Sequence, residues 1–233
     1  MSIANAHVFT APDGFRGFDC DHALTAQECK LFVDAKYRFA VRYVPRTVRN
    51  PQDLTRAEVD VIQGSGLGLM VVQHVKAAAP PWWVPTGERG GNYGATAARE
   101  AIACGIPAGV SVWCDLEGVA PHVASAQVID FCARWYKSVT AAGFIPGLYV
   151  RYNPGLSPAQ LYSLPFTHYW SAYNLNADQF PAVRGVQMKQ SEYPGADDVP
   201  GIAFEFDVNH TMADKLGGRV QLLSVPPVTP VGG

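Results

Sequence analysis

Short apolar segments alternate with longer amphipathic segments along almost the whole chain, and this alternation constrains the fold most strongly. Eight short segments have the length and the β-branched or aromatic content of strands. They are FRGFDC (15–20), FAVRYV (39–44), GLMVVQHV (68–75), GVSVWCDLE (109–117), IPGLYVRY (145–152), HYWSAY (168–173), GVQMKQ (185–190) and IAFEFDVN (202–209). Strands that alternate with helices in this number favour a (β/α)8 TIM barrel over an open doubly wound sheet, and no glycine-rich phosphate turn follows the first strand.

Helical patterns follow each of the first four predicted strands, at 24–35, 54–66, 92–105 and 124–143. Their predicted N-caps are Thr25, Thr55 and Asn92, and their predicted ends are at Gly64, Gly105 and Gly143. The units after the fifth and sixth strands are short, so we expect an irregular barrel there. A chain of 233 residues suits one α/β domain, with an extension at 1–14, the barrel at 15–222 and a flexible tail at 223–233.

Composition excludes several classes of function. The formal net charge of −2 and the pI near 6.3 give no general attraction for nucleic acid, and no apolar run reaches the roughly 18 residues of a membrane span. The five cysteines include no CxxC pair, which indicates free, buried thiols rather than disulfides or a metal site. The start MSIANAHVFTAPDGF lacks the order of a secretory signal, so we expect either synthesis in the cytoplasm without a classical signal peptide or a chain that has been trimmed. We also expect a monomer.

The stretch GVSVWCDLEG ends a predicted strand in two carboxylates, Asp115 and Glu117. Side chains two residues apart in a strand share one face, so both acids look at the same space. In a barrel, Asp19 and Asp207 would join them at the carboxyl ends of the first and last strands. Glycoside hydrolysis needs such acids, one protonated to donate to the leaving oxygen and one to stabilise the reacting carbon or activate water. The longer Glu117 is the expected donor, and solvated strand ends are the alternative interpretation.

FRGFDCD, SVWCDLEG, PGLYVRY, YWSAY, GVQMKQ and FDVN, in this order over residues 15 to 210, resemble the barrel motifs of glycoside hydrolase family 25 lysozymes. They resemble even more the related bacterial and phage glycoside-hydrolase-like domains. The resemblance implies that Glu117 is the general acid and that Asp115 orients or stabilises the reacting N-acetyl sugar, with Asp19 and Asp207 as the other acids. It also implies substrate-binding positions, for which core packing is the alternative: Tyr149, Trp170, Tyr173 and Gln187.

The resemblance assigns no clear role to three other features: a long loop, an arginine and two histidines. The segment AAAPPWWVPTGERGG (77–91) is predicted to be a long loop on the face where barrel active sites lie, with Trp82 and Trp83 as stacking surfaces for a sugar ring. Arg42 either neutralises a carboxylate at the mouth or sits at a solvated strand end. His74 and His122 are interpreted as structural histidines.

These observations lead to one main hypothesis and two alternatives. The main hypothesis is a peptidoglycan-directed N-acetylmuramidase that cleaves β-1,4 glycosidic bonds without a metal or an organic cofactor. It would act at the bacterial cell wall after release by a phage holin or a secretion system. The alternatives are a barrel that binds cell-wall glycan with little or no hydrolysis, and a hydrolase of another polysaccharide.

Overall fold

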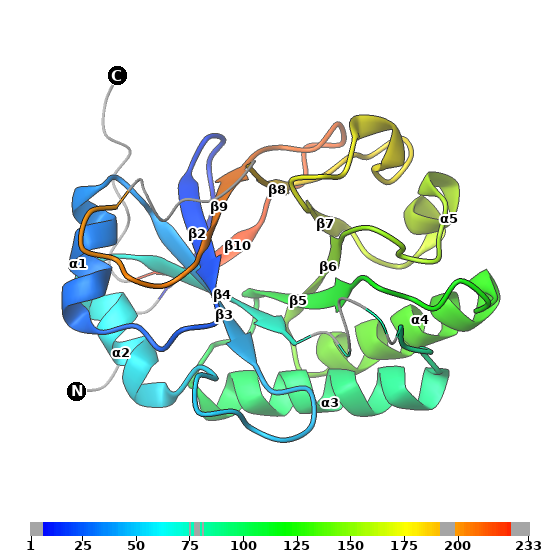
Figure 1. Cartoon of the computed structure of the whole chain (residues 1–233), viewed down its shortest axis with the longest axis horizontal. Coiled ribbons are helices and arrows are strands. Elements are labelled where there is room, and N and C mark those ends of the chain that lie inside the picture. Colours follow the sequence, from blue (N-terminus) through cyan, green and yellow to red (C-terminus); the bar gives the residue numbers. More distant parts are fainter. Residues whose placement is uncertain (1–6, 75, 77–79, 81, 192–198, 225–233) are drawn as a thin grey trace.

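A ring of strands forms the centre of the computed structural model, which describes residues 7–74, 76, 80, 82–191 and 199–224 (Figure 1). The elements, in chain order, are β1 (His7–Thr10), β2 (Arg16–Cys20), α1 (Ala26–Asp34), β3 (Phe39–Val44), α2 (Arg56–Ser65), β4 (Gly68–Gln73), α3 (Gly87–Ala103), β5 (Ser111–Leu116), α4 (Ser125–Ala141), β6 (Ile145–Val150), α5 (Pro158–Ser163), β7 (His168–Ser171), the 3-10 helix η1 (Ala177–Gln179), β8 (Met188–Gln190), β9 (Asp207–Thr211) and β10 (Gln221–Ser224).

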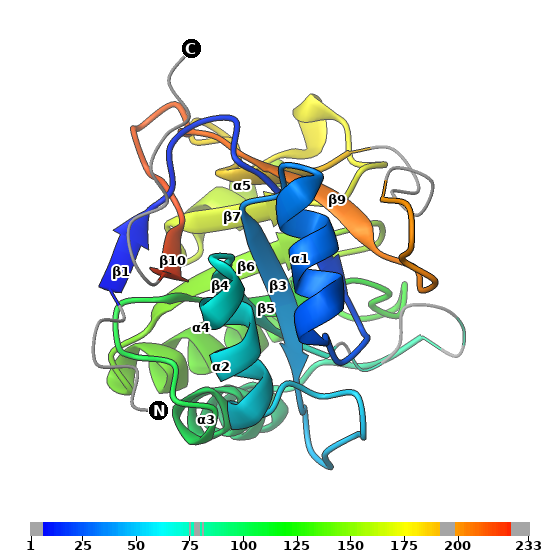
Figure 2. The ribbon, with the colours of Figure 1, turned by 90° about the vertical axis from the view of Figure 1, so that its left-hand side faces the viewer.

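The ring is a closed barrel of the eight strands β2 to β9, as the sequence predicts. Neighbouring strands from β2 to β8 pair in parallel, and the pairing of β4 with β5 belongs to the same ring. Helices α1 to α5 lie outside the ring in both views (Figures 1 and 2). The expected irregularity is confirmed, because only η1 lies between β7 and β8, and β9 runs antiparallel to both of its neighbours.

Cap chemistry sets the helix ends. Thr25 and Thr55 accept hydrogen bonds from backbone N–H groups in the first turns of α1 and α2, which confirms two predicted N-caps. The third predicted N-cap, Asn92, was wrong, because α3 begins earlier, at Gly87, and Thr86 caps it. Helix α2 also continues beyond Gly64 to Ser65, and its C-cap is Gly66, whose φ of 90° suits a residue without a side chain.

Aromatic side chains fill the inside of the ring. Phe39, Trp113 and Trp170 belong to a cluster enclosed by the strands, and each is at most 1% exposed. The Trp113 ring lies so close to Gly147 on β6 that a Cβ there would come within 2.3 Å of it. A second, larger cluster lies between the strands and the outer helices. The filled interior forms a floor on which polar residues at the carboxyl ends of the strands rest.

The two ends of the described chain pair with each other. β1 is antiparallel to β10, and Leu223 of β10 pairs with Leu69 of β4. β10 therefore crosses the predicted boundary between barrel and tail at residue 222, while 225–233 lie outside the described residues. All five cysteines are free and buried, which confirms that prediction. None of the described helices has the length and apolar character to cross a membrane.

Candidate active site

Four carboxylates lie on the inner side of the ring at its mouth. Asp19 of β2 pairs in register with Asp207 of β9, and the negative charges of Asp19 and Glu117 both act on Asp115 of β5. The sequence places Asp207 near the carboxyl end of the last strand, but it is the first residue of β9. Because β9 is antiparallel, its start lies at the mouth, so the predicted four acids still meet. Their catalytic roles remain a prediction.

Side-chain amides hold Asp19 and Asp207 together. Asp19 is 3% exposed, and its Oδ1 accepts hydrogen bonds from Nδ2 of Asn209 at 2.7 Å and Nε2 of Gln190 at 3.1 Å. The same Gln190 nitrogen donates to Oδ2 of Asp207 at 3.2 Å, so it bridges the pair. Burial raises the pKa of Asp19 to about 7, and the charge of Asp207 adds to this, against the hydrogen bonds from Asn209, Gln190 and Tyr43.

The charges of Asp115 and Glu117 have different compensation from their surroundings. They are 8% and 4% exposed, and among the described residues Oδ1 of Asp115 has no hydrogen-bond partner. Nη1 of Arg151, just after β6, lies 3.2 Å from Oε2 of Glu117. Burial and the charge of Glu117 raise the pKa of Asp115 well above its ordinary value, Asp19 adds to this, and Arg151 opposes it. Burial also raises the pKa of Glu117, but the charge and hydrogen bond of Arg151 counteract it directly.

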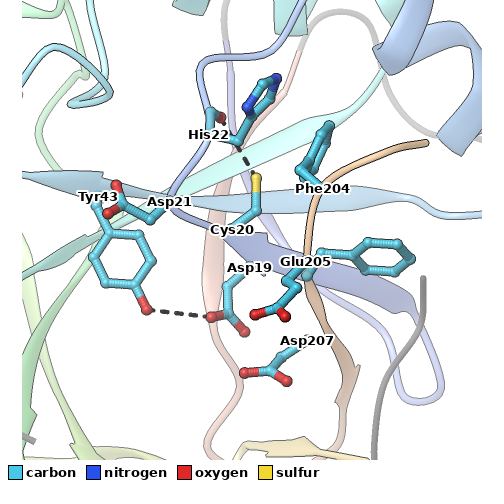
Figure 3. A pocket seen from close by; sticks show the side chains of 9 residues that line it. Asp19, Cys20, Asp21, His22, Tyr43, Phe204, Glu205 and Asp207 are labelled. Carbon is cyan, nitrogen blue, oxygen red and sulfur yellow. Dashed lines mark hydrogen bonds between the residues drawn. The ribbon is translucent and has the colours of Figure 1, made fainter.

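A cavity of about 440 Å³ opens beside Asp19 and Asp207 (Figure 3). It is lined by Asp19, Cys20, Asp21, His22, Tyr43, Phe204, Glu205, Phe206 and Asp207. At its edge the ring of His22 stacks on Phe204, with 4.0 Å between centroids and 15° between planes. The volume is within the range of small-molecule sites, and the flat rings next to carboxylates suit a sugar, which has apolar C–H faces and polar edges.

Two predicted binding aromatics support the amides from below. The Tyr149 hydroxyl donates to Oε1 of Gln190 at 2.9 Å, and Nε1 of Trp170 donates to Oδ1 of Asn209 at 2.8 Å. Tyr149 is 6% and Trp170 1% exposed, so both position other groups rather than offer a surface to a ligand. Tyr173 is only partly buried and hydrogen-bonds to Arg151, so it lies at the mouth, and its role in substrate binding stays a prediction.

Arg42 and Gln187 lie elsewhere, so the structure does not bear out a direct contact with substrate for either. Arg42 is fully buried on the helix side of β3, and its Nε donates to Oε1 of Glu58 on α2 at 2.6 Å. Gln187 is also fully buried, before the start of β8 and at the end of the barrel away from the mouth. Its amide accepts from N of Tyr169 at 2.5 Å and donates to O of Thr167 at 2.8 Å.

The two tryptophans of the predicted loop differ. Trp83 is 4% exposed, its Nε1 donates to the backbone oxygen of Glu117 at 2.7 Å, and its backbone forms a bridge with Val119. It is therefore a packing element that supports the carboxyl centre, not a stacking surface. Trp82 is partly exposed, with its ring 5.9 Å from that of Tyr152. The loop ends at Thr86, before α3, and residues 77–79 and 81 lie outside the described part of the chain.

Four residues of the mouth were not predicted: Tyr43, Arg151, Gln190 and Asn209. A signal for them was present, because each lies two residues after an inward-facing residue of the same segment. Arg151 follows Tyr149 in this way, and Asn209 follows Asp207. The period-two rule that pairs Asp115 with Glu117 finds these residues when it is applied to every strand.

Comparisons with known proteins identify the family and the fold of the chain. The family model described as Rv2525c-like, glycoside hydrolase-like domain matches residues 30–211, which include three of the four acids and begin after Asp19. The Mycobacterium tuberculosis Tat-secreted protein Rv2525c, solved with L-tartrate, is 15% identical, with coverage of 88% of this chain and 98% of its own and a TM-score of 0.64.

Two further solved structures share the fold. A muramidase from Trichobolus zukalii is 11% identical, with coverage of 84% of this chain and 93% of its own and a TM-score of 0.57. The bacterial lysozyme from Streptomyces coelicolor is 15% identical, with coverage of 86% and 93% and a TM-score of 0.53. Comparison with the curated proteins gives no match. At these identities, the likeness to solved structures shows the fold.

Proposed function

The chain belongs to the Rv2525c-like, glycoside hydrolase-like domain family, and from this premise we propose that it hydrolyses β-1,4 glycosidic bonds of peptidoglycan as an N-acetylmuramidase. The observation that carries the proposal is the pair of buried carboxyls, Asp115 and Glu117, of which only Glu117 has a cation against it. An environment that separates the protonation states of two neighbouring carboxyls supplies an acid and a base in one site. The fold shared with a muramidase and a lysozyme supports the same class of substrate.

The electrostatics favour a division of roles opposite to the one expected from the sequence. Asp115 has no ion pair of its own, and burial together with the charge of Glu117 raises its pKa and so favours its protonated form, whereas the ion pair with Arg151 favours the ionised form of Glu117. In the proposed reaction the Asp115 proton passes to the glycosidic oxygen as the bond to the anomeric carbon breaks. The Glu117 carboxylate stabilises the positive charge that develops there. Water then adds to that carbon, and its released proton restores the acid.

An activated substrate tests this division. An aryl glycoside such as a 4-methylumbelliferyl chitooligosaccharide has a leaving group that needs little protonation. We expect Asp115→Asn to lose about 10²–10⁴-fold in rate on purified peptidoglycan, the usual contribution of general acid catalysis, and to lose far less on the aryl glycoside. Glu117→Gln should lose activity on both substrates. The opposite pattern would restore Glu117 as the donor.

A second candidate function is glycan binding without turnover. The observation that favours it is the low exposure of both carboxyls, with Glu117 4% exposed and held by Arg151. A barrel with such a closed centre can still bind a sugar in the cavity beside Asp19 and Asp207. Incubation of the wild-type chain with peptidoglycan, followed by mass analysis of released fragments and a pull-down, separates the two functions. Retention on the polymer without fragments would support the binding barrel.

A further inference from the structure

Three side chains of metal-binding type meet at the rim of the mouth, apart from the carboxyl pairs described above. Asp21 follows β2, Asp53 lies after β3 and His74 follows β4, and these three strands are parallel neighbours. One ligand atom from each lies within 4.8 Å of the other two. Nε2 of His74 is 2.7 Å from Oδ1 of Asp53 and 3.8 Å from Oδ1 of Asp21. The barrel brings these residues together from positions far apart in the sequence.

The spacing of these atoms fits a small divalent cation. Zinc binds imidazole nitrogen and carboxylate oxygen at about 2.0–2.2 Å in a tetrahedron, which puts neighbouring ligand atoms about 3.4 Å apart. The separations of 2.7 Å and 3.8 Å from the His74 nitrogen lie on either side of that value. The side chain of Asp21 is 53% exposed, so it can move to close the set, and the ring of His74 can turn slightly.

The surroundings hold two of the three ligands in place. Asp53 is fully buried, and its second oxygen accepts a hydrogen bond from the backbone N–H of Asn50 at 2.6 Å. The ring of His74 stacks on Tyr43, with 4.7 Å between centroids. Residues that bind a metal are usually oriented by hydrogen bonds from neighbouring groups, and the backbone N–H of Asn50 orients Asp53 in this way. Asp21 and Tyr43 also line the cavity. Three protein ligands leave the fourth position of a tetrahedral ion free, and here that position would lie next to the cavity.

We propose that Asp21, Asp53 and His74 bind one divalent first-row transition metal ion, with zinc as the best match, at the rim of the candidate active site. One imidazole and two carboxylates form a borderline donor set that suits zinc better than calcium or magnesium, which prefer oxygen ligands only. The site is independent of the proposed hydrolysis, because neither Asp115 nor Glu117 is a ligand. It gives His74 a role in place of the purely structural one expected from the sequence.

Calorimetric titration of the full chain with zinc chloride near neutral pH, after dialysis against a chelator, tests the proposal. We expect binding of about one ion per chain. Asp21→Asn removes a ligand whose side chain is half exposed and should weaken binding at least about tenfold, and His74→Gln should weaken it at least as much. Asp34→Asn and His122→Gln are matched controls on exposed residues that do not belong to the cluster, and they should bind like the wild type.

Two results would overturn the proposal. One is a wild-type chain that binds zinc no better than Asp21→Asn and His74→Gln, which would leave His74 and Asp53 as an ordinary hydrogen-bonded pair. The other is binding of equal strength in all five proteins, which would place the metal elsewhere, for example on cysteine thiols. The titration contains no glycan, so its failure is separate from failure of the hydrolysis assay. A rise in melting temperature with zinc, seen in the wild type and absent in Asp21→Asn, is a second readout in support.

Discussion

Replacement of Arg151 by methionine tests the electrostatics of the carboxyl centre, because it removes the cation beside Glu117 and keeps most of the apolar stem. The buried Glu117 must then stay charged without a partner or take up a proton. Protonation sets the upper limit of the cost: one pKa unit corresponds to about 1.36 kcal/mol. A carboxyl with the ordinary pKa of 4.5 therefore needs about 3.4 kcal/mol at pH 7 and about 0.7 kcal/mol at pH 5.

We expect Arg151→Met to lower the free energy of unfolding by about 2–3 kcal/mol at pH 7. This is less than the roughly 3–5 kcal/mol for breaking a fully buried pair, because the Arg151 side chain is 31% exposed. The sign follows from linkage, since removal of Arg151 raises the folded-state pKa of Glu117 further above its unfolded value. The loss of stability in the variant is therefore absent below the pKa that Glu117 has in the unfolded chain. It grows as the pH rises toward the pKa that Glu117 has in the folded variant.

Urea unfolding of wild type and variant at pH 5 and pH 7 measures this difference. Arg134→Met is the matched control, because Arg134 forms an exposed pair with Asp130 on α4 and should cost under about 1 kcal/mol at either pH. Arg151→Met also removes the contact with the Tyr152 ring, and the free-energy cost of this is the same at pH 5 and at pH 7. A deficit at pH 5 as large as that at pH 7 would refute the account of Glu117 as a charge held by Arg151.

Contacts around the barrel and in its core lead to three more expected outcomes. Arg42→Ala should lower the free energy of unfolding by about 3–5 kcal/mol in urea unfolding, because it leaves Glu58 buried without its partner, and should leave the glycan affinity of the folded fraction unchanged. Trp83→Ala should cost about 3–5 kcal/mol in the same measurement, as expected for a large buried side chain, whereas Trp82→Ala should reduce peptidoglycan pull-down without loss of stability. Thiol titration of the native chain should find few reactive groups, and all five cysteines should react in denaturant; fast native reaction would show that the core around them opens.

The strands and the four acids could be predicted because both depend on local sequence. A segment such as FAVRYV is buried on both faces of the sheet and needs no distant information to be recognised, and β3 has the predicted bounds. The acids were placed at the mouth by the alternation of side chains along each strand. This reasoning survived an error in strand direction: β9 is antiparallel, but its first residue, Asp207, lies at the mouth that the carboxyl ends of the parallel strands form.

The binding residues could not be predicted with the same success because their facing depends on the partners of each strand. Arg42 lies between Val41 and Tyr43, and the barrel turns those two inward, so the arginine meets α2 instead of the mouth. Trp83 stands in a proline-rich stretch with no periodicity, where sequence alone cannot show that the indole reaches the backbone of Glu117. The ion pair of Arg151 with Glu117 joins the segments after β5 and β6, and only the fold brings these together.

The two carboxyl pairs of the mouth differ in how their charge is compensated, and this difference bears on which of them does chemistry. Amides of Gln190 and Asn209 surround Asp19, and amides donate hydrogen bonds without adding net charge. Arg151 forms an ion pair with Glu117, and its charge also acts on Asp207, where it opposes the rise in pKa that burial causes. The cation favours the ionised form of Glu117, whereas the pKa of Asp115 is raised well above its ordinary value by burial and by the charge of Glu117, and the proposed acid–base catalysis needs such an asymmetry. In the proposed function, the Asp19 and Asp207 pair, which lines the cavity, would hold a sugar there while Asp115 and Glu117 act on its bond.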